Sequence, residues 1–199
     1  MPFIFNMKTS FFFSFAMLGF TQLAAATNSI KFINHCPYSM WFWTVGPAGS
    51  KLDGHDNSRI EVPGNHGSIV HDLIATDPLS GGIALKVRDF PYHEVAPAGI
   101  VQVEYHYEPS RNGIWYDLSV IDCDHNAGPE SPNFCPLVGG GIQLHIPGAP
   151  EDQCLPASCD QEKCDNAYLT HGTWPGEPSF KCNAGVDIFV ETCKFLEPE

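Results

Sequence analysis

Hydrophobic and polar residues alternate along several short segments of the chain, which is typical of β-strands with one buried and one exposed face. The clearest segment is 101–107, in which valine and tyrosine residues alternate with Gln102, Glu104 and His106. In 39–45 both faces are hydrophobic, which favours a fully buried strand. Together the patterns predict about nine strands, at residues 30–34, 39–45, 59–62, 68–73, 83–88, 101–107, 115–121, 141–146 and 186–191.

Turn-forming residues separate these segments. Gly46-Pro47, Asn112-Gly113 and Pro147-Gly148 each stand between two predicted strands. Short strands at this spacing predict an all-β domain with the architecture of a β-sandwich. The segment 148–174 lacks the alternation: it contains three cysteines and is interpreted as a disulfide-rich loop with room for one short helical turn. Because no repeat or linker interrupts the pattern, we expect one domain.

The first 26 residues have the features of a secretory signal peptide. The basic residue Lys8 precedes the apolar run 11–20, and three alanines end at Ala26. A membrane anchor is the alternative, but the run is too short to span a bilayer. We therefore expect a secreted protein, extracellular or in the cell wall, whose mature domain covers residues 27–199. Met7 begins a complete signal on its own, so translation from Met1 or from Met7 fits this interpretation.

All eight cysteines follow the predicted signal peptide: Cys36, Cys123, Cys135, Cys154, Cys159, Cys164, Cys182 and Cys193. An even number in a secreted chain predicts four disulfides, but eight cysteines allow 105 pairings. The spacing of Cys154, Cys159 and Cys164 also suits a metal site, whereas an oxidising compartment favours disulfides. We expect no metal and no cofactor.

The formal net charge of the chain is −13. A strongly acidic surface repels nucleic acid and anionic membranes, so we expect neither as a partner of the mature form. The same surface is compatible with a neutral polysaccharide, although solubility in an acidic medium explains most of the charge. We expect a monomer.

Four short motifs resemble those of thaumatin-like proteins, and they occur in the same order. Residues 34–41 (NHCPYSMW) resemble the opening strand of that family, and 116–122 (YDLSVID) a central strand. Residues 164–168 (CDNAY) and the interval 182–193 between two cysteines resemble its last part. The cysteine-dense hairpin of plant members is missing. The chain is therefore most similar to a fungal branch, the Blastomyces yeast-phase-specific protein family, and the resemblance implies a thaumatin-like β-sandwich.

The resemblance also implies one disulfide. It pairs the first cysteine with the last, Cys36 with Cys193, which would tie the first strand to the last. Cys164 and Cys182 would then pair back to the middle of the chain, with Cys135 as one partner.

Thaumatin-like proteins have a cleft that contains one arginine, one glutamate and three aspartates. The resemblance places the glutamate at Glu104 and the first two aspartates at Asp117 and Asp122. The arginine has no clear counterpart, and the candidates are Lys86 and Arg88, which share one face of a predicted strand.

The third aspartate should follow Ala167-Tyr168, but residues 171–174 contain no carboxylate. Glu177 is close in sequence, yet the sequence alone does not place it in the cleft. The predicted ligand-binding set is therefore incomplete compared with the family pattern.

A pair of carboxyl groups across a glycosidic bond supplies a general acid and a base or nucleophile. In this chemistry Glu104 would be the acid and Asp117 the base. The alternatives are that Glu104 is an outward polar residue of its strand and that Asp122 opens the turn before Cys123. Because Asp117 and Asp122 are an odd number of residues apart, a shared cleft also requires a bend between them.

Two other groups of residues are weaker candidates. A metal site is suggested by three histidines, His66, His71 and His106. Oxidative copper chemistry is a separate possibility, but it would need an N-terminal histidine where the predicted mature chain has Thr27. The second group is aromatic and contains Trp41, Phe42, Trp43, Tyr105 and Tyr107. These residues could form a platform on which a sugar stacks, but the simpler interpretation is that most of them belong to the buried core.

Three functions follow from these observations. The first is binding of cell-wall β-1,3-glucan through the acidic cleft, with little or no hydrolysis. The second is a weak endo-β-1,3-glucanase that uses Glu104 and Asp117. The third is an effector or inhibitor that acts on a host or competitor protein.

Overall fold

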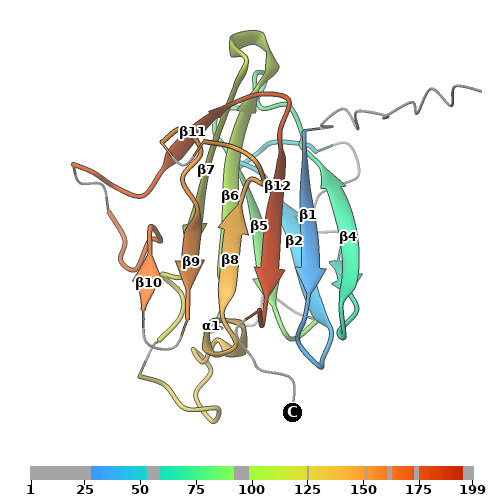
Figure 1. The fold of residues 1–199 in the computed structure, drawn as a ribbon, viewed down its shortest axis with the longest axis vertical. Coiled ribbons are helices and arrows are strands. Elements are labelled where there is room, and N and C mark those ends of the chain that lie inside the picture. Colours follow the sequence, from blue (N-terminus) through green and yellow to red (C-terminus); the bar gives the residue numbers. More distant parts are fainter. Residues whose placement is uncertain are drawn as a thin grey trace, which may run out of the picture.

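The computed structural model describes residues 28–52, 59–91, 99–124, 126–150, 152–160, 163–172 and 175–194. The predicted signal peptide, residues 1–26, and the predicted first mature residue Thr27 lie outside this range. The described residues form a β-sandwich of two six-stranded sheets, as the alternating pattern predicted. Figure 1 views the sandwich with the first sheet in front of the second.

The first sheet has the strand order β10-β9-β8-β12-β1-β4. Its strands are β1 (Ser29–Asn34), β4 (Gly67–Asp72), β8 (Ile142–His145), β9 (Ala157–Cys159), β10 (Cys164–Asp165) and β12 (Asp187–Thr192). The second sheet has the order β11-β7-β6-β5-β2-β3. It contains β2 (Met40–Val45), β3 (Arg59–Val62), β5 (Ile83–Arg88), β6 (Val101–Glu108), β7 (Gly113–Ser119) and β11 (Phe180–Asn183).

The core lies between the sheets and is filled by the inward residue of each alternating pair. Phe32 of β1 stacks on Phe42 of β2 with their ring centroids 4.5 Å apart, which joins the two sheets. Both rings are fully buried, as are Leu85, Val103 and Leu118. Each fully buried side chain of this size contributes about 1.5–3 kcal/mol through removal of apolar surface from water.

The first and last described strands are neighbours. β1 pairs with β12 in parallel, from Ser29 opposite Asp187 to Asn34 opposite Thr192. A disulfide between Cys36 and Cys193 follows directly at the end of this ladder, which confirms the predicted pairing. The buried Asn34 amide donates to the carbonyl oxygens of Tyr38 and Val62, so the end of β1 is held by polar contacts as well.

The other predicted pairings are wrong. Cys135 pairs with Cys123, Cys182 with Cys154, and Cys164 with Cys159. Cys159 and Cys164 lie opposite each other in the β9–β10 hairpin, so Cys164 has a local partner rather than one in the middle of the chain. All eight cysteines are bonded, which agrees with the predicted four disulfides.

All nine predicted strands are present within one or two residues at each end, and three further strands were not predicted. β9 and β10 lie in the segment interpreted as a loop, and β11 follows it. They are two to four residues long, too short for alternation to be recognised. Among the described residues the helices are α1 (Pro136–Gly139) and the 3-10 turn η1 (Pro109–Arg111), and none is long and apolar enough to cross a membrane.

Candidate functional site

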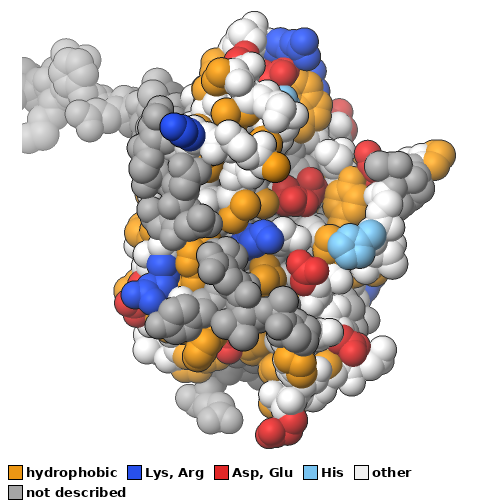
Figure 2. Space-filling model, turned by 180° about the vertical axis from the view of Figure 1, so that it is seen from behind, with side chains coloured by type: hydrophobic (Ala, Val, Ile, Leu, Met, Phe, Trp, Pro, Cys, Tyr) orange, Lys and Arg blue, Asp and Glu red, His pale blue; other side chains and the backbone are white. Residues whose placement is uncertain are grey.

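Glu104 and Asp117 lie directly opposite each other on the neighbouring strands β6 and β7. Both alternate with core residues and therefore point to the outer face of the second sheet. Figure 2 shows this face, on which acidic side chains lie near the centre beside hydrophobic and basic ones. The two carboxyl groups line a groove of about 470 Å³, which extends past Ala84 and Pro47.

The two carboxyl groups share a hydrogen bond, and their electrostatics are coupled. Desolvation and the adjacent Glu104 charge raise the pKa of Asp117 to about 8. Desolvation also raises the pKa of Glu104, but the hydrogen bond from Asp117 and the charge of Lys86 both oppose this shift. At neutral pH the arrangement is therefore a protonated Asp117 that donates to an ionised Glu104.

These electrostatics reverse the roles expected from the sequence. The sequence interpretation made Glu104 the protonated acid and Asp117 the ionised base. Asp117 keeps the proton because it is the more deeply placed carboxyl group and because Glu177 adds a second negative charge beside it. Its Oδ1 atom is buried without a hydrogen-bond partner among the described residues, which further disfavours ionisation.

Asp122 reaches the same region through a turn. β7 ends at Ser119, and the chain bends there, so the odd spacing from Asp117 does not send Asp122 to the opposite face. The Gln102 amide donates to Asp122 Oδ2 at 3.2 Å, and the charge of Asp122 acts on Glu104. The bend that the sequence interpretation required is therefore present.

Of the two candidate cations, Lys86 is the one whose charge acts on the carboxyl pair. Lys86 lies on β5, directly opposite Gln102 of β6. Gln102 is two residues along β6 from Glu104 and points to the same face. Arg88 lies further along the same strand face, opposite Trp41, with its guanidinium 5.6 Å from the centre of the Phe90 ring. The charge that acts on Arg88 is that of Asp89.

Glu177 is a site residue that the sequence interpretation did not place. It accepts a hydrogen bond from the Tyr168 hydroxyl, and its negative charge acts on Asp117. Tyr168 is held beside β7 by two backbone hydrogen bonds, from its N–H to Leu118 and from the Val120 N–H to its carbonyl. Desolvation and the nearby carboxylates raise the pKa of Tyr168 to about 12. Glu177 thus adds a fourth acidic group to Glu104, Asp117 and Asp122, where the resemblance had implied a third aspartate.

One side of the groove is aromatic and polar. Trp115 and His106 both line it, with ring centroids 5.9 Å apart. The ammonium of Lys181 lies 4.9 Å from the Trp115 ring, in a cation–π contact. Of the predicted stacking platform, Phe42, Trp43 and Tyr105 are buried and belong to the core, as the simpler alternative stated.

The histidines predicted as a metal site do not meet. His71 is buried and within 3.2 Å of the Tyr105 hydroxyl, His106 contacts Glu108, and His66 contacts His35. Among the described residues no group of three or more histidine, cysteine or acidic side chains is arranged to hold a metal ion.

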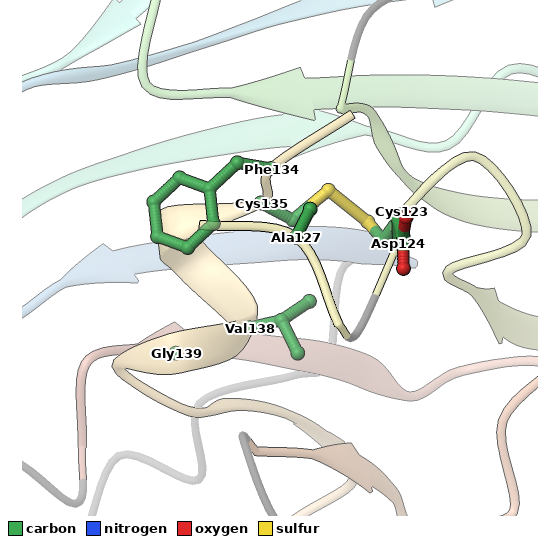
Figure 3. A pocket seen from close by; sticks show the side chains of 7 residues that line it. All are labelled: Cys123, Asp124, Ala127, Phe134, Cys135, Val138 and Gly139. Atoms are coloured by element: carbon green, nitrogen blue, oxygen red, sulfur yellow. A yellow bond between two sulfur atoms is a disulfide. The ribbon is translucent and has the colours of Figure 1, made fainter. Parts of the chain in front are cut away.

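A second cavity of about 90 Å³ lies beside the Cys123–Cys135 disulfide. Figure 3 shows Phe134 and Val138 at its sides and the disulfide between the two loops that form it. Ligand sites usually have volumes of several hundred Å³, so this cavity is too small for a sugar. The groove at Glu104 is the better candidate.

Comparison with known proteins agrees with this architecture. The crystal structure of the protein elicitor MoHrip2 from Magnaporthe oryzae is similar, with a TM-score of 0.55 and 14% identity over 83% of this chain and 98% of that chain. The thaumatin-like xylanase inhibitor TLXI has a TM-score of 0.45 and 13% identity over 82% of this chain and 98% of that chain. No curated protein matches the chain.

The sequence model of one family matches residues 17–130, which is more than half of the chain. The matched part includes Glu104, Asp117 and Asp122 and ends before Glu177. Its two sheets form the β-sandwich that the sequence predicted. The chain belongs to the Blastomyces yeast-phase-specific protein family.

Proposed function

We propose that the protein is secreted and binds cell-wall β-1,3-glucan through the acidic groove, with little or no hydrolysis. Four disulfides are typical of a protein that folds in an oxidising compartment, which supports secretion. A neutral polymer is also compatible with a chain whose net charge is −13.

The lining of the groove supports a sugar ligand. Its volume of about 470 Å³ is in the range of small-ligand sites. Glu104 supplies hydrogen-bond acceptors for sugar hydroxyls, while the single O–H of protonated Asp117 donates to Glu104 and holds it in place. Trp115 adds an aromatic surface at the edge, although Lys181 occupies part of it.

The contact between Glu104 and Asp117 is the observation that carries the proposal of little or no hydrolysis. Glycosidases hold their two carboxyl groups about 5–9.5 Å apart, so that the scissile bond fits between them. Here the two groups are hydrogen-bonded to each other. A glycosidic bond does not fit between them, and the second candidate function, a weak endo-β-1,3-glucanase, would need the pair to separate.

The floor of the groove favours a chain that crosses the sheet. Val45, Ala84, Glu104 and Asp117 lie side by side on four neighbouring strands. Ala84 is the smallest of these side chains, so the floor is lowest there. A linear polymer that passes over Ala84 would reach the carboxyl pair with an internal segment, and its ends would remain free.

Binding of the pure protein to a panel of insoluble polysaccharides tests the proposal. We expect retention on β-1,3-glucan, a loss of at least half of it in Glu104→Gln, and a larger loss in Ala84→Leu, which fills the floor. Glu61→Gln is the matched control, because it removes the same charge from the same sheet outside the groove. Retention unchanged in both groove variants would refute the site, and release of reducing ends that stops in Glu104→Gln would favour the glucanase.

A protein partner is the other candidate. The observation that favours it is the structural similarity to a protein elicitor, although 14% identity establishes a shared fold and nothing further. In this case the protein would act on a host or competitor protein, and it would bind none of the polysaccharides in the panel.

A further inference from the structure

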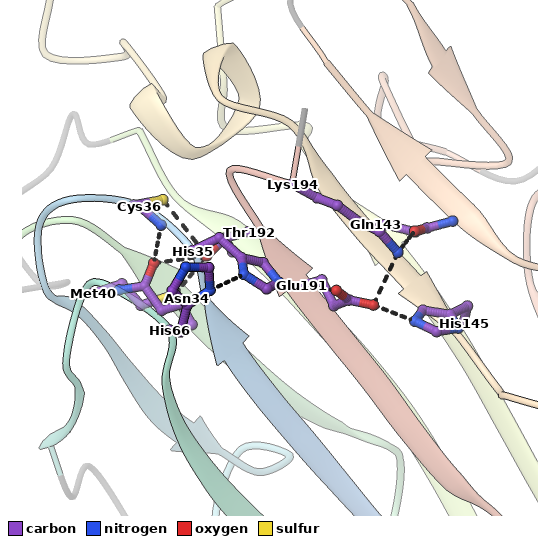
Figure 4. Close-up of polar contacts among 10 residues, drawn as sticks. All are labelled: Asn34, His35, Cys36, Met40, His66, Gln143, His145, Glu191, Thr192 and Lys194. Carbon is purple, nitrogen blue, oxygen red and sulfur yellow. Dashed lines mark hydrogen bonds and ion pairs between the residues drawn. The ribbon is translucent and has the colours of Figure 1, made fainter. Parts of the chain in front are cut away.

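Three histidines and one glutamate form a line across the outer face of the first sheet, on the side opposite the acidic groove (Figure 4). His66 Nδ1 lies 2.7 Å from His35 Nδ1, and His35 Nε2 lies 3.0 Å from Glu191 Oε2. His145 Nε2 lies 2.7 Å from Glu191 Oε1 on the other side. We call His66, His35, Glu191 and His145 the histidine chain.

Hydrogen-bond chemistry limits how many protons this chain holds. A contact between two ring nitrogens needs one donor and one acceptor, and a neutral imidazole has one of each. The Nε2 of His35 donates to the Glu191 carboxylate. Neutral His35 therefore accepts at Nδ1 from His66, whereas protonated His35 donates at Nδ1 to neutral His66. If both rings are protonated, two N–H groups and two positive charges face each other, and the contact is lost.

We propose that the histidine chain is a proton-sensitive lock, in which a first proton is shared between His35 and His66 and a second proton releases the His66 side chain. The segment that His66 belongs to is the turn between β3 and β4. Histidines change charge between about pH 5 and 8, so the release falls in a mildly acidic medium.

The backbone of this turn gives the release a structural consequence. Asn65 and His66 have φ angles of 55° and 69°, in the left-handed region that is unfavourable for most residues. Their N–H groups donate to the carbonyl oxygens of Cys36 and Asn34, both at 2.8 Å. The ring contact with His35 supports the same conformation. We expect its loss to loosen the turn, while the Cys36–Cys193 disulfide keeps the end of β1 in place.

Among the described residues, the other charged groups on this face and on β3, which leads into the turn, do not replace either ring. Lys194 donates to Glu191 Oε1 at 3.1 Å and to Gln143. Lys31 of β1 lies over the Phe189 ring, and Asp187 of β12 accepts from Ser29. On β4, Asp72 lies at the opposite end of the strand, opposite Ser29. On β3, Arg59 and Glu61 precede the turn, and Glu61 accepts from Ser39.

Titration of the histidine ring resonances by NMR tests the proposal on the unmodified protein. We expect His35 and His66 to titrate together in two steps whose midpoints differ by about one pH unit or more. In His66→Gln, His35 should titrate in one step. His106, whose ring nitrogen contacts Glu108 and, among the described residues, no second histidine, is the internal control for a ring outside the histidine chain. Independent single-step curves for His35 and His66 in the wild type would overturn the proposal.

Amide hydrogen exchange provides a second measurement. After correction for the intrinsic pH dependence, we expect the amides of His66 and Gly67 to lose protection between pH 7.5 and pH 5 in the wild type. In His66→Gln, the protection of the amides at positions 66 and 67 should be the same at both pH values. The exchange of the β12 amides should be unchanged. Protection at His66 that is equal at both pH values, or that falls equally in His66→Gln, would refute the link between the second proton and the turn.

Discussion

Replacing Asp117 by asparagine should stabilise the protein at high pH and have no effect at low pH. An asparagine side chain has nearly the shape of a protonated aspartate, and its amide can donate to Glu104 as the carboxylic acid does. The variant therefore keeps the hydrogen bond of the carboxyl pair and removes only the ability to ionise.

The size of the effect follows from the raised pKa. The ordinary pKa of the group is 3.8, and in the folded protein burial and Glu104 raise it to about 8. Well below the ordinary pKa of 3.8 both states bind the proton, so wild type and variant differ little there. As pH rises from about 4 to 8, the unfolded wild type ionises Asp117 freely while the folded state resists, so the wild type loses stability. A rise of the Asp117 pKa from 3.8 to about 8 corresponds to a ceiling of about 6 kcal/mol, and because the groove is open to water we expect about 2 kcal/mol at pH 8.

Urea unfolding of both proteins between pH 4 and pH 8 measures this difference. Asp72→Asn is the matched control, because it removes an exposed carboxylate at the edge of the other sheet. A variant that is destabilised at pH 8, or whose effect does not vary with pH, would show that Asp117 is not the protonated member of the pair.

Three further predictions test other parts of the molecule. The Glu191 pKa is lowered to about 2, because its hydrogen bonds from His35 and His145 outweigh the effect of burial. Glu191→Gln should therefore cost about 1–2 kcal/mol at pH 6, an effect lost as pH falls from 4.5 towards 2, measured by urea unfolding at each pH. Removing the Cys36–Cys193 disulfide by a double alanine substitution should cost about 2–5 kcal/mol, the upper end being the loop-entropy value for 157 residues, and a thermal unfolding shift near zero would contradict this. Intact-mass measurement of the secreted protein should give a chain that begins at Thr27 with four disulfides, and an alkylated thiol without reduction would count against it.

The strands that carry the site were predictable from the sequence, because their alternation is a local signal. Residues 101–107 show it clearly, so Glu104 was placed on an outward face, and the structure agrees. The cross-strand register that pairs Glu104 with Asp117 is not a local property. This register depends on the β6–β7 connection and on packing in the core. The distribution of the proton between Glu104 and Asp117 depends in turn on the register.

Glu177 and the disulfide pairs show why other features escaped prediction. Glu177 lies in the chain between Tyr168, which bridges to Ser119, and β11, which pairs with β7, and its charge acts on Asp117. No periodicity marks such a loop. In the same way, Cys159 and Cys164 pair because a short hairpin sets them opposite each other, and a two-residue strand leaves no pattern in the sequence.

The parallel pairing of β1 with β12 has a consequence for synthesis of the chain. Ser29 of β1 pairs with Asp187 of β12. The centre of the first sheet therefore cannot form until β12, the last of the described strands, has been synthesised. During translocation β1 and β4 can form only an isolated antiparallel pair, which is marginal in water. The second sheet, whose strands β5, β6 and β7 are consecutive hairpin neighbours, can assemble meanwhile. We therefore expect the first sheet to be completed only after β12 has been synthesised, with the bond between Cys36 and Cys193 the last of the four disulfides to become possible.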